Sequence, residues 1–323
     1  MTRIICGIDV ASKSLESRIG QQGAAGLFPN TAEGIAALGA FCQAHQVELV
    51  AMEATGGYEQ QAFAQLSEQG QPVAVLNPRA VRQFAQSMGR LEKTDRIDAS
   101  MIAWYAEVKK SQPASLAPES QQHLRALVTR LRQLTEMRTA QLNQQRLVTD
   151  RAVQASFRKL LTVLAGQIRD LEQRIAALIE KDPLWRELNE AFRTIKGVAD
   201  RTVARLMAEM PEIGTLSNKT ISKLAGVAPL ANDSGKHQGK RVVRGGRAAV
   251  REILFIVASV VGRYEPDFAA FQQRLRAAGK PLRVVRIALA HKLLVRLNAK
   301  AREVRQRLTV LPPNHKTLSA SAI

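Results

Sequence analysis

A pair of aspartates raises the first chemical question in this sequence. Asp95 and Asp98 are three residues apart in KTDRIDASMIA (93–103), and a helix would place both carboxylates on one face. Two neighbouring carboxylates repel each other unless a positive charge lies between them. The sequence leaves two sources of that charge open: a bound metal ion, or salt bridges to Lys93 and Arg96.

Two further carboxylates fall at the ends of apolar segments that are typical of buried strands. RIICGIDVA (3–11) ends near Asp9, and VELVAMEA (47–54) ends near Glu53. If the two strands are parallel neighbours, their carboxyl ends meet at one edge of the sheet, where a packed helix could add the aspartate pair. Four carboxylates in a small volume require cations. Two Mg²⁺ ions about 4 Å apart would bind them and support phosphoryl transfer.

The elements that would position these acids alternate between strand and helix. Apolar runs predict buried strands at 3–11, 47–54 and 72–78. Helical periodicity and terminal glycines predict helices at 31–45, 58–70 and 79–89, and a further helix that continues to Lys110. Such alternation predicts a largely parallel sheet covered by helices. Cys6 and Cys42 are too few for a zinc site or a disulfide framework, so both are expected to be core thiols.

The composition changes after the linker-like segment SQPASLAPES (111–120). Residues 121–181 are almost free of Gly and Pro and predict two long helices that fold back as an antiparallel coiled pair. The segment at 192–210 is similar to a helix-hairpin-helix, whose turn amides bind phosphate, but Ala199 replaces the usual second glycine and an ordinary helical turn is the alternative. An apolar helix is expected after Gly246. Another helix, with a basic stripe, is expected at 282–307.

Charge is divided unevenly along the chain. The formal net charge is +19, yet residues 1–119 carry 10 Lys+Arg against 12 Asp+Glu, while residues 120–323 carry 37 against 16. From Ser234 onward, 19 basic residues stand against 4 acidic ones. This density predicts a polyanionic partner, and nucleic acid is favoured over a membrane surface because the basic segments lack aromatic anchors. Without a membrane-length apolar run or a signal-peptide pattern, a cytoplasmic, nucleoid-associated protein with no membrane partner is expected.

Several segments resemble, in order, the bridge-RNA-guided DEDD transposases of insertion sequences, a family that includes the pilin-gene invertases. They are GIDVASK (7–13), AMEATGGY (51–58), LNPRAVRQFAQSMG (76–89) followed by KTDRIDASMIA, AGVAPLANDSG (225–235) and VRGGRAAVREIL (243–254). The resemblance implies an RNase H-like (RuvC-like) α/β domain at 1–112 and a helical coiled-coil region at 113–184. It further implies a mainly α transposase domain at 185–310 and a loose tail at 311–323.

The same resemblance implies the roles of individual residues. The acidic tetrad that holds Mg²⁺ falls on Asp9, Glu53, Asp95 and Asp98, and the family's serine falls on Ser234. A serine hydroxyl becomes a nucleophile when a base or a metal activates it, and its attack on a DNA phosphate would give a phosphoserine bond. The residues alone favour a tight turn at Asp-Ser-Gly.

Basic residues around Ser234 are expected to hold phosphates, with a solvated loop as the alternative. They are Lys236, Lys240, Arg241, Arg244 and Arg247. His237 could assist proton transfer to or from the serine.

The expected function is therefore DNA recombination that moves an insertion sequence, guided by a structured non-coding RNA and performed by a dimer or tetramer. The nearest alternative is a RuvC-type, metal-dependent nuclease that hydrolyses DNA with water. GIDVASKS also resembles the first phosphate loop of actin-like sugar kinases, but the basic helical second half supplies neither a second α/β half nor an adenosine-binding loop. A non-catalytic nucleic-acid-binding protein would explain the charge but not the acids embedded in strands.

Overall fold

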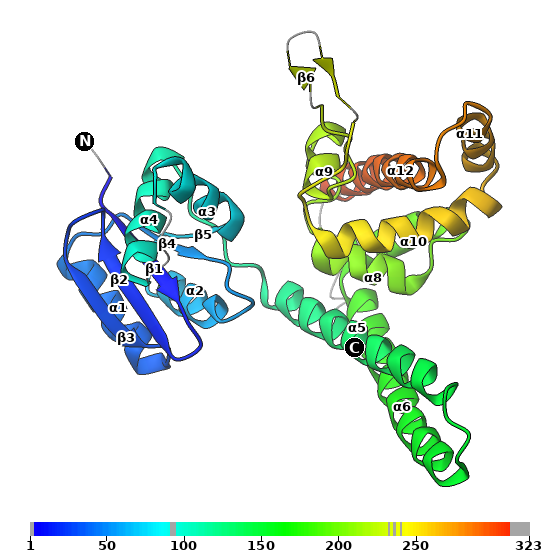
Figure 1. The fold of residues 1–323 in the computed structure, drawn as a ribbon, viewed down its shortest axis with the longest axis horizontal. Helices are drawn as coiled ribbons and strands as arrows, with labels where there is room; N and C mark the ends of the chain where they lie inside the picture. Colours follow the sequence, from blue (N-terminus) through cyan, green and yellow to red (C-terminus); the bar gives the residue numbers. More distant parts are fainter. Residues whose placement is uncertain (1–2, 91–94, 232, 235–236, 240, 311–323) are drawn as a thin grey trace, which may run out of the picture. The chain divides into compact units, whose positions relative to one another are not determined.

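The chain forms two compact units, Met1–Ala117 and Pro118–Ile323 (Figure 1). The computed structural model describes residues 3–90, 95–231, 233–234, 237–239 and 241–310. The division between the units falls inside the segment expected to be a linker. The tail expected at 311–323 lies outside the described residues. No helix in the described ranges is long and apolar enough to cross a membrane.

The first unit is built on a five-stranded sheet with the order β3-β2-β1-β4-β5. Its strands are β1 (Ile5–Val10), β2 (Ser14–Ile19), β3 (Ala25–Pro29), β4 (Leu49–Glu53) and β5 (Val73–Leu76). The first three form an antiparallel meander, whereas β4 and β5 run parallel to β1 and to each other. This order and these directions fit the expected RNase H-like α/β class.

The prediction of a largely parallel sheet is wrong, because it did not include the antiparallel strands β2 and β3. Both strands lie on one side of β1, and their residues alternate between more and less exposed positions. Polar residues interrupt β2 (SLESRI), so it lacks the continuous apolar run that marks β1 and β4. β3 (AGLFP) is apolar, but it is only five residues long and contains Gly26 and Pro29, residue types that are depleted in strands.

Helices cover both faces of this sheet. They are α1 (Ala32–Ala44), α2 (Glu59–Glu68), α3 (Pro78–Ser87) and α4 (Asp95–Val108). Helices α1 and α2 share a core with Ile8 and Met52, while α3 and α4 share a core with Leu49 on the opposite face. Both cysteines are free and buried in the first of these cores, which confirms that they are core thiols.

The second unit is helical, and its hydrophobic core is continuous from Leu124 to Val304. Its helices are α5 (Glu119–Gln145), α6 (Arg151–Lys181), α7 (Pro183–Arg193), α8 (Asp200–Glu209), α9 (Asn218–Leu224), α10 (Ala248–Tyr264), α11 (Pro266–Ala277) and α12 (Leu282–Val310). A short ribbon of β6 (Asp233–Ser234) and β7 (His237–Gln238) precedes α10. The two long helices predicted at 121–181 are confirmed as α5 and α6, while their supercoiling as a coiled coil stays a prediction.

Candidate active site

Asp9 and Glu53 lie at the carboxyl ends of adjacent parallel strands. Ile8 of β1 is paired with Met52 of β4, so the two acids occupy the next register position. Since side chains alternate along a strand, they share the face of Leu49, which α4 covers. Neighbouring strands are about 4.8 Å apart, and both acids are half-buried. The structure therefore brings these two predicted site residues together.

Helix α4 lies directly against β1 because Gly7 has no side chain. A Cβ at Gly7 would be only 2.0 Å from the Ala99 carbonyl oxygen. At the far end of the helix, Arg3 Nη1 donates to the Ser111 carbonyl at 3.3 Å, so α4 runs antiparallel to β1. Asp95 lies four residues before Ala99, which is about 6 Å along the helix. Asp9 lies two residues after Gly7, which is about 6.6 Å along the strand.

The first turn of α4 therefore extends toward the Asp9 end of β1. Asp95 begins this helix and Asp98 follows three residues later. The side chains of both aspartates lie outside the described part of the structure. Among the side chains that are described, no group of three or more His, Cys, Asp or Glu could hold a metal ion.

Two polar side chains fix the loops that follow the acid-bearing strands. Asn30 donates from Nδ2 to the Ala11 carbonyl at 2.9 Å and to the Tyr58 carbonyl at 3.2 Å, which joins the loop after β1 to the start of α2. Glu59 accepts the backbone N–H groups of Thr55 and Gly57 through one carboxylate oxygen, both at 2.9 Å. These bonds hold the ends of β1 and β4 in place.

Glu16 is an acidic residue at this site that the sequence reasoning missed. It lies in β2 directly opposite Asp9, and residues paired in this way share one face of the sheet. The row Glu16, Asp9 and Glu53 thus crosses three adjacent strands. The sequence gives little sign of this position, because three polar residues in a row, Glu16, Ser17 and Arg18, hide the alternating burial of β2. The donors are all carboxylate oxygens, the ligand type that Mg²⁺ prefers, so their chemistry suits that ion, but these three described residues do not by themselves form a group that could hold it.

Ser234 lies in the ribbon of the second unit. It pairs with His237, and Asp233 pairs with Gln238, so only two residues connect the strands. A further bridge joins Leu230 to Val242. The position implied for the family's serine therefore lies in the last residue pair of a β-ribbon, and the two connecting residues lie outside the described part of the structure.

The basic residues predicted around Ser234 differ in their surroundings. Arg241 forms an ion pair with Asp233 across the ribbon at 2.9 Å, and about half of its side chain is exposed. Arg244 is exposed. Lys236 and Lys240 lie outside the described residues. Phosphate binding by these four residues stays a prediction.

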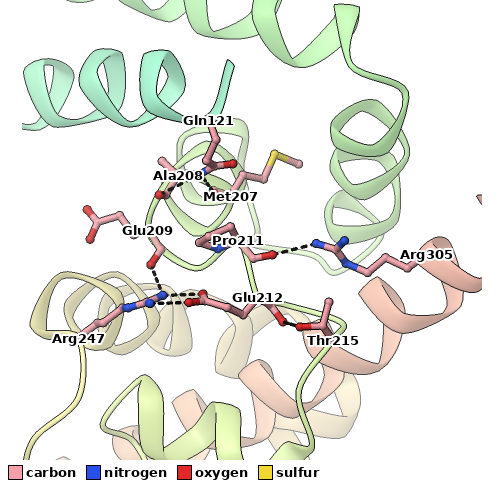
Figure 2. A network of polar contacts seen from close by, with 9 residues as sticks. All are labelled: Gln121, Met207, Ala208, Glu209, Pro211, Glu212, Thr215, Arg247 and Arg305. Atoms are coloured by element: carbon pink, nitrogen blue, oxygen red, sulfur yellow. Dashed lines mark hydrogen bonds and ion pairs between the residues drawn. The ribbon is translucent and has the colours of Figure 1, made fainter. Parts of the chain in front are cut away.

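Arg247 is partly buried and is bound by groups of the second unit, as Figure 2 shows. Its guanidinium donates two hydrogen bonds to the Glu212 carboxylate, at 2.6 and 2.7 Å, and one to the Glu209 carbonyl at 2.8 Å. Partial burial opposes ionisation of Glu212, but the hydrogen bonds and charge of Arg247 outweigh it and lower the pKa of this carboxyl below its ordinary value. This geometry favours a role for Arg247 in positioning the loop.

Backbone contacts complete the fixed base of the loop that carries Ser234. The Arg247 N–H donates to the Leu224 carbonyl at 2.8 Å. Gly246 has a φ of +67°, and a Cβ there would lie 2.3 Å from the Gly226 nitrogen. A side chain at Gly246 would therefore push apart the two segments AGV and GGR, both of which belong to the motifs noted in the sequence.

The helix-hairpin-helix-like turn between α7 and α8 already binds an internal carboxylate. The backbone N–H of Lys196 donates to Glu265 Oε1 at 2.6 Å, and Glu265 is only 9% exposed. Asp200 in the first turn of α8 pairs with Arg193 at 3.1 Å. These internal bonds favour the alternative of an ordinary helical turn.

Comparisons with known proteins match both segments that hold the candidate residues. A family model described as "Transposase" (DEDD_Tnp_IS110) matches residues 6–152, and one described as "Transposase IS116/IS110/IS902 family" matches residues 189–273. The pilin gene-inverting proteins of Moraxella bovis and Moraxella lacunata are each 28% identical over 281 residues, which cover 83% of this chain and 85% of each relative. The chain belongs to the IS110 family of DEDD transposases and recombinases, which are enzymes that act on DNA.

A solved structure of Thermus thermophilus RuvC is also similar to part of the chain. It has 18% sequence identity and a TM-score of 0.27, and the match covers 34% of this chain and 99% of RuvC. The RNase H-like fold of the first unit is assigned from its strand order and strand directions.

Proposed function

We propose that this protein is a DNA recombinase that moves an insertion sequence by cutting and rejoining strands, with Ser234 as the nucleophile. Asp9, Glu53, Asp95 and Asp98 would hold Mg²⁺ in this proposal. Family membership supports the reaction class. The observation that carries the catalytic part is the adjacent, same-face position of Asp9 and Glu53, beside which α4 begins with the other two acids. Mg²⁺, when bound, would neutralise phosphate charge and lower the pKa of an attacking hydroxyl.

In the proposed step, the Ser234 hydroxyl oxygen attacks the phosphorus of a DNA phosphodiester. A phosphoserine ester forms, the bond from phosphorus to one sugar oxygen breaks, and that oxygen gains a proton while the serine loses one. Attack by a sugar hydroxyl on the phosphoserine then restores a phosphodiester and frees the serine. Each step breaks one phosphate ester bond and forms another, so no external energy source is needed. His237 is the candidate proton acceptor, supported by its register position opposite Ser234.

A guide RNA and an oligomer complete the proposal. The excess of basic residues after residue 119 supports a polyanionic partner, which would be donor DNA, target DNA and a structured non-coding RNA. A dimer or tetramer is proposed because joining two DNA molecules requires at least two nucleophiles.

The proposal is tested by trapping the phosphoserine. Full-length protein is mixed with Mg²⁺, RNA transcribed from the non-coding DNA that flanks its gene, and a nicked target DNA that cannot be rejoined, and then denatured and digested. DNA should be attached to the peptide containing NDSGK. Ser234→Ala should give neither adduct nor cleavage, because the reacting oxygen is missing. Asp9→Asn should give no adduct although its serine is intact, because it lacks a ligand for the ion.

Cleavage by Ser234→Ala at the parental rate would contradict the serine mechanism and favour the nuclease alternative, in which water is the attacking group. Equal activity of Asp9→Asn and the parent protein would contradict the metal-site assignment.

A further inference from the structure

The second unit contains a basic hollow that belongs to neither the ribbon nor the carboxylate site. Residues of α10, α11 and α12 line an open hollow of about 430 Å³ near the C-terminal end of α10. Figure 1 shows where these three helices lie. We call it the three-arginine pocket, because each helix contributes one arginine to its lining: Arg263, Arg276 and Arg286. Arg263 is 15 residues beyond Ala248 on α10, which is about 22 Å along the helix from the base of the serine loop.

Two of these arginines are held in place by neutral neighbours. The side-chain amide of Gln272 is assigned the orientation in which both of its ends form hydrogen bonds. Its oxygen accepts from Arg276 Nη2 at 2.9 Å, and its nitrogen donates to the Gly262 carbonyl at 3.1 Å. The Arg286 guanidinium lies 4.8 Å from the centre of the Phe255 ring. Neither contact neutralises the positive charge. Because the guanidinium groups are positioned in advance, less conformational entropy is lost when they bind a ligand.

Among the described residues that line the pocket, none is Asp or Glu. The nearby acids Glu265 and Asp267 are paired with Arg296, which is not a lining residue. Three positive groups from three helices repel one another unless an anion lies among them, and arginine binds phosphate oxygens through pairs of N–H groups.

The other residues that line the pocket favour the phosphate of an unpaired nucleotide over the phosphates of a duplex. Leu282 of α12, which is 55% exposed, gives the hollow an apolar side above the buried Val285 and Leu289, and Gln273 adds an exposed amide. The phosphates of a duplex lie on a convex surface whose bases are stacked inside. An unpaired nucleotide can instead place its base in a hollow and its phosphate at the rim.

We propose that the three-arginine pocket binds one unpaired nucleotide of a nucleic-acid strand. The phosphodiester would contact the three arginines, and the base would lie against Leu282 near the Gln273 amide. This inference rests on the proposed function only in that nucleic acid is the partner. It adds a binding site for a single-stranded segment away from Ser234.

The test measures fluorescence anisotropy of short labelled strands with the full-length protein. The probes are single-stranded RNA, single-stranded DNA of the same sequence, and the corresponding DNA duplex. Arg276→Gln and Arg286→Gln should each weaken the binding of an unpaired strand about tenfold, because a charge-assisted hydrogen bond is lost. Gln273→Glu should weaken it as well, by adding a negative charge at an exposed position. The probe with the larger loss identifies the strand, RNA or DNA.

Arg274→Gln is the matched control. It removes the same charge two residues away on α11, where Arg274 lies over the Phe271 ring at 5.2 Å and does not line the pocket. Equal weakening by Arg274→Gln and Arg276→Gln would overturn the proposal, as would a loss of duplex affinity as large as that for the unpaired strands. These measurements need no cleavage, so their failure and a failure of the serine mechanism are distinguishable.

Discussion

The carboxylates of this protein differ in the groups that lie beside them. Glu212 and Glu265 are bound by arginines of the same unit, and each satisfies internal backbone or side-chain donors. Asp9 and Glu53 stand side by side at adjacent strand ends. Two neighbouring carboxylates repel each other, and the metal ion of the proposed function would offset that repulsion.

The pair of Arg247 and Glu212 gives a pH-dependent prediction. Glu212→Gln should lower the free energy of unfolding by roughly 1–2 kcal/mol at neutral pH, a value reduced because both side chains are about one-third exposed. The folded-state pKa of Glu212 lies below its ordinary value of 4.5. Its contribution is therefore complete above about pH 4.5 and is lost as the pH falls through the lower, folded-state pKa. The parent and variant should converge there, as measured by urea unfolding.

Glu136→Gln supplies a comparison for this experiment. Glu136 pairs with Arg132 one helical turn away, but its side chain is 59% exposed. Exposed pairs of this kind contribute little to stability. If both variants lost the same stability at every pH, Glu212 would have no special role in fixing the loop.

At the level of whole elements, the contact between α4 and β1 decides whether the four acids can converge. Gly7→Ala should destabilise the protein by about 1–3 kcal/mol, because the new Cβ meets backbone atoms that cannot rotate away. The first turn of α4 should move away from Asp9, so DNA cleavage should also be lost at temperatures where the variant remains folded. Thermal unfolding and a cleavage assay measure the two effects.

Gly166→Ala provides the control for the glycine substitution. Nothing lies within 4 Å of the place where its Cβ would be, in the middle of α6. Alanine is the better helix former, so this change should leave stability unchanged or raise it by about 0.5–1 kcal/mol. A Gly7→Ala protein that behaved like Gly166→Ala would show that close packing of α4 is not required.

For the molecule as a whole, the uneven charge predicts how nucleic acid is bound. If six or more phosphates are contacted, affinity for DNA should fall by about 10³-fold or more between 50 and 200 mM salt, because counterions are released on binding. Anisotropy titrations of the full-length protein over this range measure the slope. Binding that did not respond to salt would contradict the phosphate-dominated interface.

Glu53→Gln should keep or raise DNA affinity, since it removes a negative charge, while it should abolish cleavage.

Local patterns in the sequence determined much of this protein. The apolar runs ending at Asp9 and Glu53 predicted β1 and β4, and the stretch after residue 120, which is almost free of Gly and Pro, predicted α5 and α6. Such patterns can be recognised in the sequence because burial of one face of a helix or strand spaces its apolar residues at regular intervals. Ser234 was found through family motifs, since a turn-forming Asp-Ser-Gly carries no chemical signal by itself.

Other features were decided only by the tertiary structure. Strand β2 and its Glu16 depend on pairing with β1, because a half-exposed strand has no apolar run of its own. Arg247 differs from its basic neighbours only because Glu212, 35 residues earlier, lies within hydrogen-bonding distance. The three-arginine pocket needs three helices to meet. Sequence spacing fixes which side chains share one element, but contacts between elements arise from packing, and those contacts set which charges are neutralised and which stay available for a ligand.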